Sequence, residues 1–265
     1  MKKICVYGKG GIGKSTTVAN LAAAFAYNGY KTAVVGCDPK ADSTRNLTGR
    51  RIDTVLDIIH KRKDGDIFVL GYKDIVCIEA GGPSPGTGCA GRGIVVALEE
   101  IDRAKLLKDR DIVIYDVLGD VVCGGFSAPL RENVADDVYI VTTSDFMSLY
   151  AANNICKGIE KYAREGTVRL AGIIYNGRSS LDSEDMVYEF ANRIGSKVIG
   201  KIPMSEYISK AEVCRQTVIE KYPGSDISRV FMELAHDVME NSLGTIPEYL
   251  SYEEVENLCM PYLKN

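Results

Sequence analysis

The chain has 265 residues, 46% of them hydrophobic, and a formal net charge of −4 with acidic and basic residues intermixed. This length and apolar content suit one large α/β domain or two small ones, and the charge is not that of a general nucleic-acid-binding protein. No apolar run reaches the roughly 18–20 residues that cross a bilayer, and the segment before the first glycine cluster is too short for a signal peptide, so we expect a cytoplasmic protein with neither a membrane nor a nucleic-acid partner.

Short apolar runs typical of strands alternate with longer stretches of helical periodicity. The first strand is expected at 4–7, and a helix is expected at 15–27 with its apolar residues on one face. Further strands are expected at 32–36, 75–78, 112–115, 138–141, 170–175 and 197–200, with a glycine- and proline-rich loop at 81–93. Apolar strands separated by helices predict an α/β fold, in which a mostly parallel sheet carries helices on both faces. We expect a single domain over 1–265, with a tail, 244–265, that could wrap its surface.

The residues that join the first strand to the first helix form a phosphate-binding loop. Gly8–Ser15 matches G-x-x-x-x-G-K-[ST] in full, after a strand and at the start of a helix. A chance glycine turn is the alternative, but both the spacing and the context agree with the motif. The fold class expected is therefore a P-loop NTPase domain that binds ATP and Mg²⁺ through backbone N–H groups and the helix N-terminus. The residues expected to bind are Gly10, Gly11, Ile12, Gly13, Lys14 on the phosphates and Ser15 on Mg²⁺.

Aspartates follow two of the predicted strands, at the sheet edge where ligands gather in open α/β folds. Asp116 fits the carboxylate that holds the Mg²⁺ shell, and Asp38 could orient or deprotonate the attacking water. Asp42 and Asp120 are further candidates, and the N–H of Gly119 could sense the γ-phosphate. Isolated aspartates are more often helix caps or turn residues, but the nearby phosphate loop favours the functional interpretation.

Two of the eight cysteines differ from the rest in their surroundings. Cys89 and Cys123 lie among glycines after predicted strands, whereas the other six lie mostly in strand or helix patterns, where a small buried thiol is expected. Iron–sulfur clusters usually take four thiolates, and a symmetric dimer with two cysteines from each chain would supply that number. The residues alone leave a second interpretation open, in which both thiols are simply buried.

Long motifs give this chain a resemblance to a known family. The phosphate loop, with its early Lys9, resembles the deviant loop shared by ParA/MinD ATPases, arsenite-pump ATPases and nitrogenase iron proteins. Four segments then resemble the nitrogenase iron-protein family in particular, and the likeness runs over about 1–240. They are CDPKADST at 37–44, GGPSPGTGCAGRG at 81–93, DVLGDVVCGGF at 116–126 and YAANNI at 150–155.

The resemblance implies a homodimer bridged by one [4Fe-4S] cluster on Cys89 and Cys123 of both subunits. It implies ATP-gated transfer of a low-potential electron, taken from a donor such as ferredoxin, to a catalytic protein that docks near Arg92. Because Cys123 lies only seven positions after Asp116, a nucleotide-driven shift of that loop would move a cluster ligand. The nucleotide roles fall on Lys9 (across the dimer interface), Lys14, Ser15, Thr16, Asp38, Asp116 and Asp120, with Asn176 at the adenine and Pro203 beside it.

Departures from the family pattern guide the choice of branch. The segment between Leu56 and Cys77 is short for a nitrogenase protein, and Pro203 is followed by Met204-Ser205 where those proteins have Arg-Asp. Ala41 stands where the chlorophyll-pathway donors usually carry histidine. We therefore expect the electron donor for reductive cyclisation of nickel-sirohydrochlorin a,c-diamide, with a nitrogenase iron protein as the alternative. A positioning ATPase or an iron–sulfur carrier is a third interpretation, which the cysteine pair disfavours.

Overall fold

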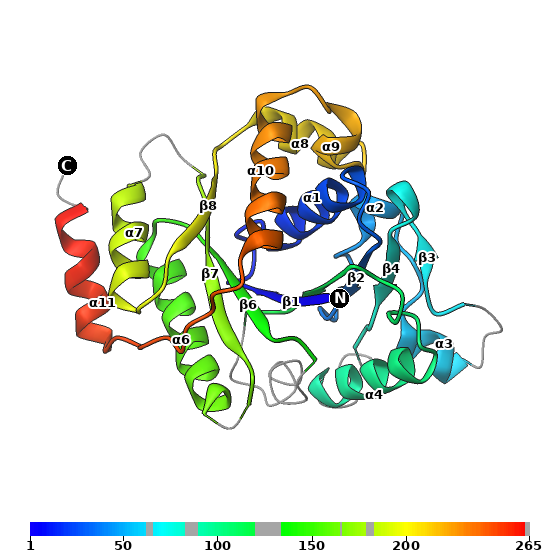
Figure 1. Ribbon diagram of the computed structural model, residues 1–265, viewed down its shortest axis with the longest axis horizontal. Helices are drawn as coiled ribbons and strands as arrows, with labels where there is room; N and C mark the ends of the chain where they lie inside the picture. Colours follow the sequence, from blue (N-terminus) through cyan, green and yellow to red (C-terminus); the bar gives the residue numbers. More distant parts are fainter. Residues whose placement is uncertain (62–65, 83–89, 120–133, 165, 179–182, 263–265) are drawn as a thin grey trace.

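The computed structural model describes residues 1–61, 66–82, 90–119, 134–164, 166–178 and 183–262 (Figure 1). Within them, eight strands form one sheet in the order β3-β4-β2-β5-β1-β6-β7-β8, with every neighbouring pair parallel except β3 and β4. The strands are β1 (Lys2–Tyr7), β2 (Thr32–Gly36), β3 (Val69–Leu70), β4 (Val76–Glu79), β5 (Ile112–Asp116), β6 (Asp137–Thr142), β7 (Arg169–Asn176) and β8 (Val198–Ile202).

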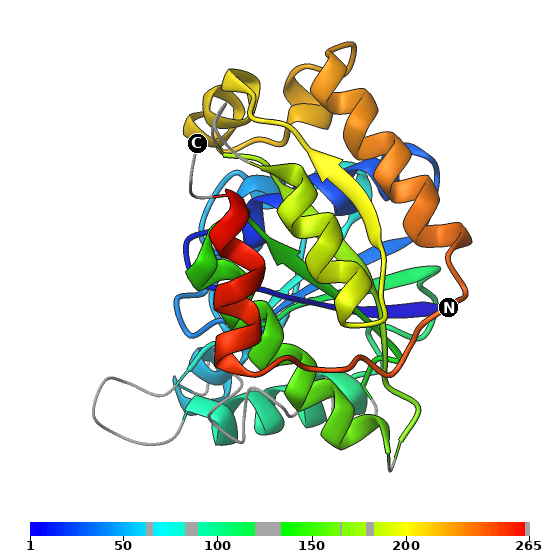
Figure 2. The same cartoon turned by 90° about the vertical axis from the view of Figure 1, so that its left-hand side faces the viewer.

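Helices cover both faces of this sheet, as Figures 1 and 2 show. One face carries α1 (Lys14–Tyr27), α2 (Arg45–Thr48), α8 (Glu206–Val213), α9 (Val218–Lys221) and α10 (Asp226–Glu240), whose apolar side chains share one buried cluster. The other face carries α3 (Val55–Lys61), α4 (Ala90–Arg103), α6 (Phe146–Ala163), α7 (Glu184–Arg193) and α11 (Tyr252–Cys259) around a second cluster. Short 3₁₀ turns occupy Tyr72–Asp74 and Met260–Tyr262. The predicted α/β fold with a mostly parallel, doubly covered sheet is confirmed.

The central strands are apolar throughout because both of their faces are buried. Every residue of β2 and of β5 is buried, which is the pattern expected of parallel strands between two helical layers. The carboxyl ends of β1, β5 and β2 lie side by side, with Asp116 paired in register to Val6 and to Gly36. This edge of the sheet therefore brings together the loops that follow the three strands.

One local expectation is wrong. The glycine-rich segment was expected to be loop as far as 93, but α4 begins at Ala90. Ile94, Ala97 and Ile101 follow helical spacing and are buried, so packing on the sheet outweighs the low helix propensity of the glycines at 91 and 93. The two-residue strand β3 was not predicted, and the other strands and α1 fall within two residues of their expected limits.

The chain after α10 returns along α6 and α7. Thr245 pairs with Leu170 in an antiparallel bridge, and the side-chain amide of Asn153 both donates to and accepts from the backbone of Leu250, at 2.8 Å each. Beyond them α11 buries Val255 and Leu258 against the second cluster. Among the described residues, no helix is long and apolar enough to cross a bilayer.

Candidate nucleotide-binding site

The loop between β1 and α1 has the form of an anion-binding site. The chain turns at Gly13, whose φ of 87° lies in the left-handed region that favours glycine, and α1 begins at the next residue. Gly13 has no side chain to cap the helix, and the first turn contains no acidic residue. The N–H groups of this turn therefore point toward an open cavity with the positive end of the helix dipole behind them. The cavity, about 370 Å³, is lined by Gly10, Gly11, Gly13, Lys14, Ser15 and Thr16 among others.

Lys14, which lines this cavity, forms a buried ion pair with Asp116. The lysine ammonium donates a hydrogen bond to Asp116 Oδ1, and the two side chains are 6% and 0% exposed. Asp116 Oδ2 is buried and has no hydrogen-bond partner among the described residues. A buried carboxylate oxygen without a partner costs free energy, so an ion or a metal-bound water would be well accommodated there. This orphaned oxygen, with the cradle of N–H groups, fits a magnesium–nucleotide ligand.

The loop 38–44 forms the facing wall of the same cavity. Asp38 is buried, and its Oδ1 accepts a hydrogen bond from the backbone N–H of Lys40 at 2.9 Å. Asp42 is exposed and lines the cavity together with Ser43. Both predicted aspartates thus lie beside the phosphate loop, while Asp38 also stabilises its own turn.

Gly119 lies directly against the phosphate loop. A Cβ atom at this position would overlap the carbonyl oxygen of Gly8, so only glycine fits here. The strand β5 therefore brings the backbone after Asp116 into contact with the loop after β1. Asp120, the next predicted residue, lies outside the described residues.

A second cavity of about 290 Å³ adjoins the first and shares Gly13 and Thr16 with it. Asn176 and Pro203, expected near the adenine, both line this second cavity. The amide of Asn176 also donates to the carbonyl oxygen of Ile12 at 2.6 Å, so it braces the phosphate loop as well. The two connected cavities suit a ligand with a polyanionic end and a planar end.

Among the lining residues that were not predicted from sequence, two make hydrogen bonds to the phosphate loop or to the start of α1. Glu212 of α8 accepts a hydrogen bond from the Thr16 hydroxyl at 3.0 Å, and Arg178 donates one to the carbonyl oxygen of Gly11. Both line both cavities. They lie more than 160 residues from the phosphate loop in sequence, in no motif, so only the fold reveals them.

Lys9 also lines the first cavity. Its side chain is 40% exposed, and its ammonium lies 3.9 Å from the carboxylate of Asp145, the N-cap residue of α6. The remaining predicted residues lie apart from the cavity or outside the described residues. Arg92 is exposed on α4. Cys89 and Cys123 lie outside the described residues.

The six described cysteines are free thiols, and all except Cys214 are buried. Burial raises the pKa of Cys77 to about 12 and that of Cys259 to about 11. A thiol that holds its proton this firmly is a poor nucleophile and a poor metal ligand. The prediction that most of the other cysteines are packing residues is thus confirmed for these five.

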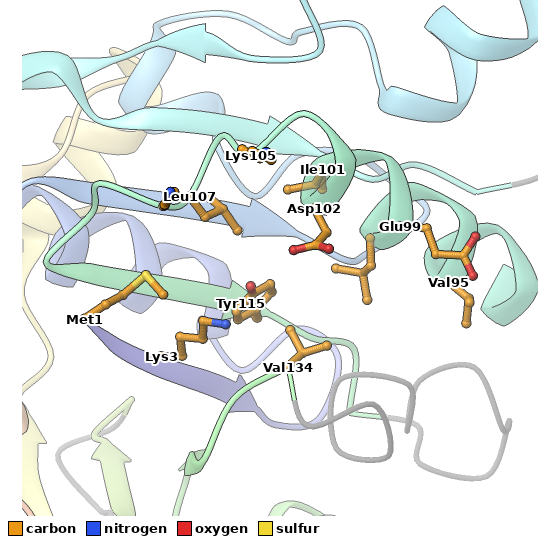
Figure 3. A pocket seen from close by; sticks show the side chains of 12 residues that line it. Met1, Lys3, Val95, Glu99, Ile101, Asp102, Lys105, Leu107, Tyr115 and Val134 are labelled. Carbon is orange, nitrogen blue, oxygen red and sulfur yellow. The ribbon is translucent and has the colours of Figure 1, made fainter.

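A larger cavity, about 590 Å³, lies on the other face of the sheet (Figure 3). Apolar side chains of α4, such as Val95 and Ile101, form one wall, and Tyr115 and Lys3 form the opposite wall. Burial raises the pKa of Tyr115 beyond its usual range, so this phenol stays neutral. The orphaned Asp116 oxygen and the glycine cradle favour the smaller pair of cavities as the functional site.

The sheet, the phosphate loop and the Lys14–Asp116 pair together define an α/β ATPase of the P-loop class. Solved structures agree on the fold: MinD of Pyrococcus furiosus superposes with a TM-score of 0.70 at 19% identity, over 90% of this chain and 98% of that one. MinD of Aquifex aeolicus gives 0.68 at 19% identity, over 92% and 100%.

Sequence comparison defines the family more narrowly. Residues 2–265 match the 4Fe-4S iron sulfur cluster binding proteins of the NifH/frxC family, and the chain belongs to that family. It is 52% identical over 265 residues to a nitrogenase iron protein of Methanococcus voltae, covering 97% of this chain and 95% of that protein. It is 50% identical over 274 residues to nitrogenase iron protein 2 of Methanothermococcus thermolithotrophicus, covering 96% and 94%.

Membership of the NifH/frxC family confirms the expected cofactors and the general expected activity. The cofactors are ATP, Mg²⁺ and a [4Fe-4S] cluster. The protein is an ATP-dependent electron-transfer component that acts as a homodimer and donates electrons to a catalytic partner.

Proposed function

We propose that this chain is the ATP-dependent electron donor for the reductive cyclisation of a nickel tetrapyrrole, nickel-sirohydrochlorin a,c-diamide. The observation that supports nucleotide binding is a glycine-lined cavity in which Lys14 is paired with the buried carboxylate of Asp116. The sequence Pro203-Met204-Ser205 and the short segment before Cys77, which depart from the nitrogenase pattern, support this branch.

In the proposed site each residue has a distinct task. Lys14, now bonded to Asp116, would bind the β- and γ-phosphates, and Asp116 and Ser15 would hold the Mg²⁺ shell. Asp38 and Asp42 face the γ-phosphate side of the cavity, where Asp38 orients the attacking water. Asn176, Pro203 and Glu212 surround the purine and ribose.

Electron transfer would be coupled to this site through the loop after β5. Asp116 and Gly119 lie at the beginning of that loop, where Gly119 packs against Gly8 of the phosphate loop. Cys123 follows Gly119 four residues later in sequence. Cys89 and Cys123 of each subunit would hold the cluster, which supplies a low-potential one-electron couple when bound. A change at the γ-phosphate would therefore move Cys123 and bias the dimer between two states.

A second function is favoured by the relatives. Those at 49–52% identity bear the name nitrogenase iron protein, which makes a nitrogenase catalytic component the competing partner. In either case the partner docks near the exposed Arg92 and a ferredoxin-type protein supplies the electron.

Anaerobic purification followed by reconstitution tests the proposal. We expect about four irons per dimer, lost in Cys123→Ala but retained in Cys214→Ala, which changes an exposed cysteine at the C-terminal end of α8. The loaded protein is then assayed with MgATP and dithionite against the tetrapyrrole cyclase component and against a nitrogenase catalytic component. Reduction of the nickel tetrapyrrole supports the proposal, whereas activity with the nitrogenase component alone selects the second function. An iron-free ATPase rejects both.

A further inference from the structure

A buried carboxylate lies behind the wall of the nucleotide cavity, at the end of β4. Glu79 is 1% exposed and lines none of the cavities described above. Its Oε1 accepts two hydrogen bonds from Thr44, one from the backbone N–H and one from the hydroxyl, both at 2.7 Å. Glu79 therefore holds the last residue of the loop that carries Asp38 and Asp42.

Thr44 is the N-cap residue of α2, yet its hydroxyl does not cap that helix. A threonine in this position ordinarily accepts a bond from the N–H groups of its own helix. Here the hydroxyl donates to Glu79 instead, so the local capping bond is replaced by a contact 35 residues away. The hydroxyl of Thr44 thereby attaches the loop to β4 instead of capping α2.

The opposite side of the Glu79 carboxylate is crowded. Glu79 Oε2 and the hydroxyl oxygen of Ser43 are both buried, and neither has a hydrogen-bond partner among the described residues. Both side chains fill the space beside Gly36, where a Cβ atom would overlap Oε2 and lie 2.8 Å from Ser43 Cβ. Two polar groups that could bond to each other thus lie close together without doing so.

Other contacts attach the same loop to the backbone after β4. The N–H of Ala80 donates to the carbonyl oxygen of Gly36 at 2.8 Å. A Cβ atom on Gly82 would lie 2.7 Å from Pro39 Cβ, so that backbone lies flat against the loop. The loop 38–44 and the residues 79–82 thus pack as one unit.

We infer that Glu79 is a positioning residue for ATP hydrolysis, which acts through Thr44 to hold Asp38 and Asp42 in place over the phosphate loop. The inference rests on the proposed function, because the reaction it serves is hydrolysis in this cavity. The Glu79 carboxylate does not touch the nucleotide. Its loss lowers turnover without removing the phosphate-binding groups of Lys14 and Ser15.

A double-mutant cycle in the full-length, cluster-loaded protein tests this. Glu79→Met removes both acceptor oxygens and Thr44→Val removes the hydroxyl donor, whereas Thr44→Ser keeps both donors. We expect each of the first two to lower kcat for ATP hydrolysis about tenfold with the Kd for ATP changed less than about threefold, because small misplacement of reacting groups costs rate before affinity. The double variant should lose no more than the worse single variant, and Thr44→Ser should match the wild type.

Ser228→Ala is the matched control, because it removes an equally buried hydroxyl between α9 and α10, away from the cavity. Hydrogen exchange of the peptide covering 38–48 gives a readout that does not depend on activity. Glu79→Met should speed exchange of the Thr44 amide while α1 stays protected, which also shows that the variant is folded.

Unchanged kcat in Glu79→Met, or an equal loss in Ser228→Ala, would overturn the inference. If the wild type itself hydrolyses no ATP, the proposed function fails, and the exchange measurement alone judges the role of Glu79. In that case unchanged protection of Thr44 in Glu79→Met overturns it, and faster exchange confined to the loop supports it.

Discussion

At the residue scale, we expect the Lys14–Asp116 pair to contribute both to ATP binding and to the stability of the fold. Removal of one partner leaves an unpaired buried charge, which costs about 3–5 kcal/mol. We expect Lys14→Gln to lower the free energy of unfolding by roughly that amount and to abolish ATP binding. Lys14→Met combined with Asp116→Asn should recover most of the stability but none of the binding. Thermal unfolding and isothermal titration with ATP, both anaerobic, check this, and a single variant as stable as the wild type would contradict it.

Glu79 makes stability depend on pH. Burial raises its pKa from 4.5 to about 7, opposed by the Thr44 hydrogen bonds and assisted by the charges of Asp116 and Asp42. The folded state therefore holds a proton that the unfolded state releases above pH 4.5, so this contribution to stability is full below that pH and is lost as the pH rises through 7. With about 1.4 kcal/mol per pKa unit, the loss is roughly 3 kcal/mol.

Glu79→Gln has no proton to lose, so its stability relative to the wild type should rise between pH 5 and pH 8. Unfolding midpoints of both proteins at several pH values measure the difference. A difference that stays constant, or that changes in the opposite direction, would show that the pKa of Glu79 is not raised in the folded state.

At the scale of elements, one side chain of α6 makes hydrogen bonds to the backbone of the tail. Asn153 is buried and makes two hydrogen bonds to the backbone of Leu250, so Asn153→Ala leaves two backbone groups without partners. We expect a loss of about 1–3 kcal/mol and faster proteolysis within 246–262. The neighbouring Asn154 is exposed and provides a matched control, because Asn154→Ala should leave the cleavage rate unchanged. Equal cleavage rates in both variants would contradict this role.

At the scale of the whole molecule, the question for Lys9 is whether it acts in its own nucleotide site or in that of the partner subunit. Within one chain it lies 3.9 Å from Asp145, on an exposed surface where an ion pair contributes little. A trans role for Lys9 predicts complementation between inactive variants. Mixed dimers of Lys9→Ala and Lys14→Gln should hydrolyse ATP at one site, because the site with an intact Lys14 receives Lys9 from its partner. Mixed dimers without activity would place Lys9 in its own site.

Much of this protein could be predicted from local pattern. The strands and α1 are set by apolar runs and helical periodicity, and the phosphate loop by the spacing of Gly8, Gly13 and Lys14. The start of α4 was missed because two glycines argue for a loop, while the burial of Ile94 and its helical neighbours depends on a sheet far away in sequence. Local propensity is weak beside such packing.

The fold class, the nucleotide loop and the family can be derived from the sequence alone, because each depends on contiguous residues whose spacing meets the physical requirement. Which distant groups meet depends instead on the tertiary fold. It paired Lys14 with Asp116, brought Glu212 and Arg178 to the cavity and seated Glu79 beneath Thr44. Those contacts join residues 35 to 196 positions apart. They arise because parallel strands deliver their carboxyl ends to one edge, which no local pattern specifies.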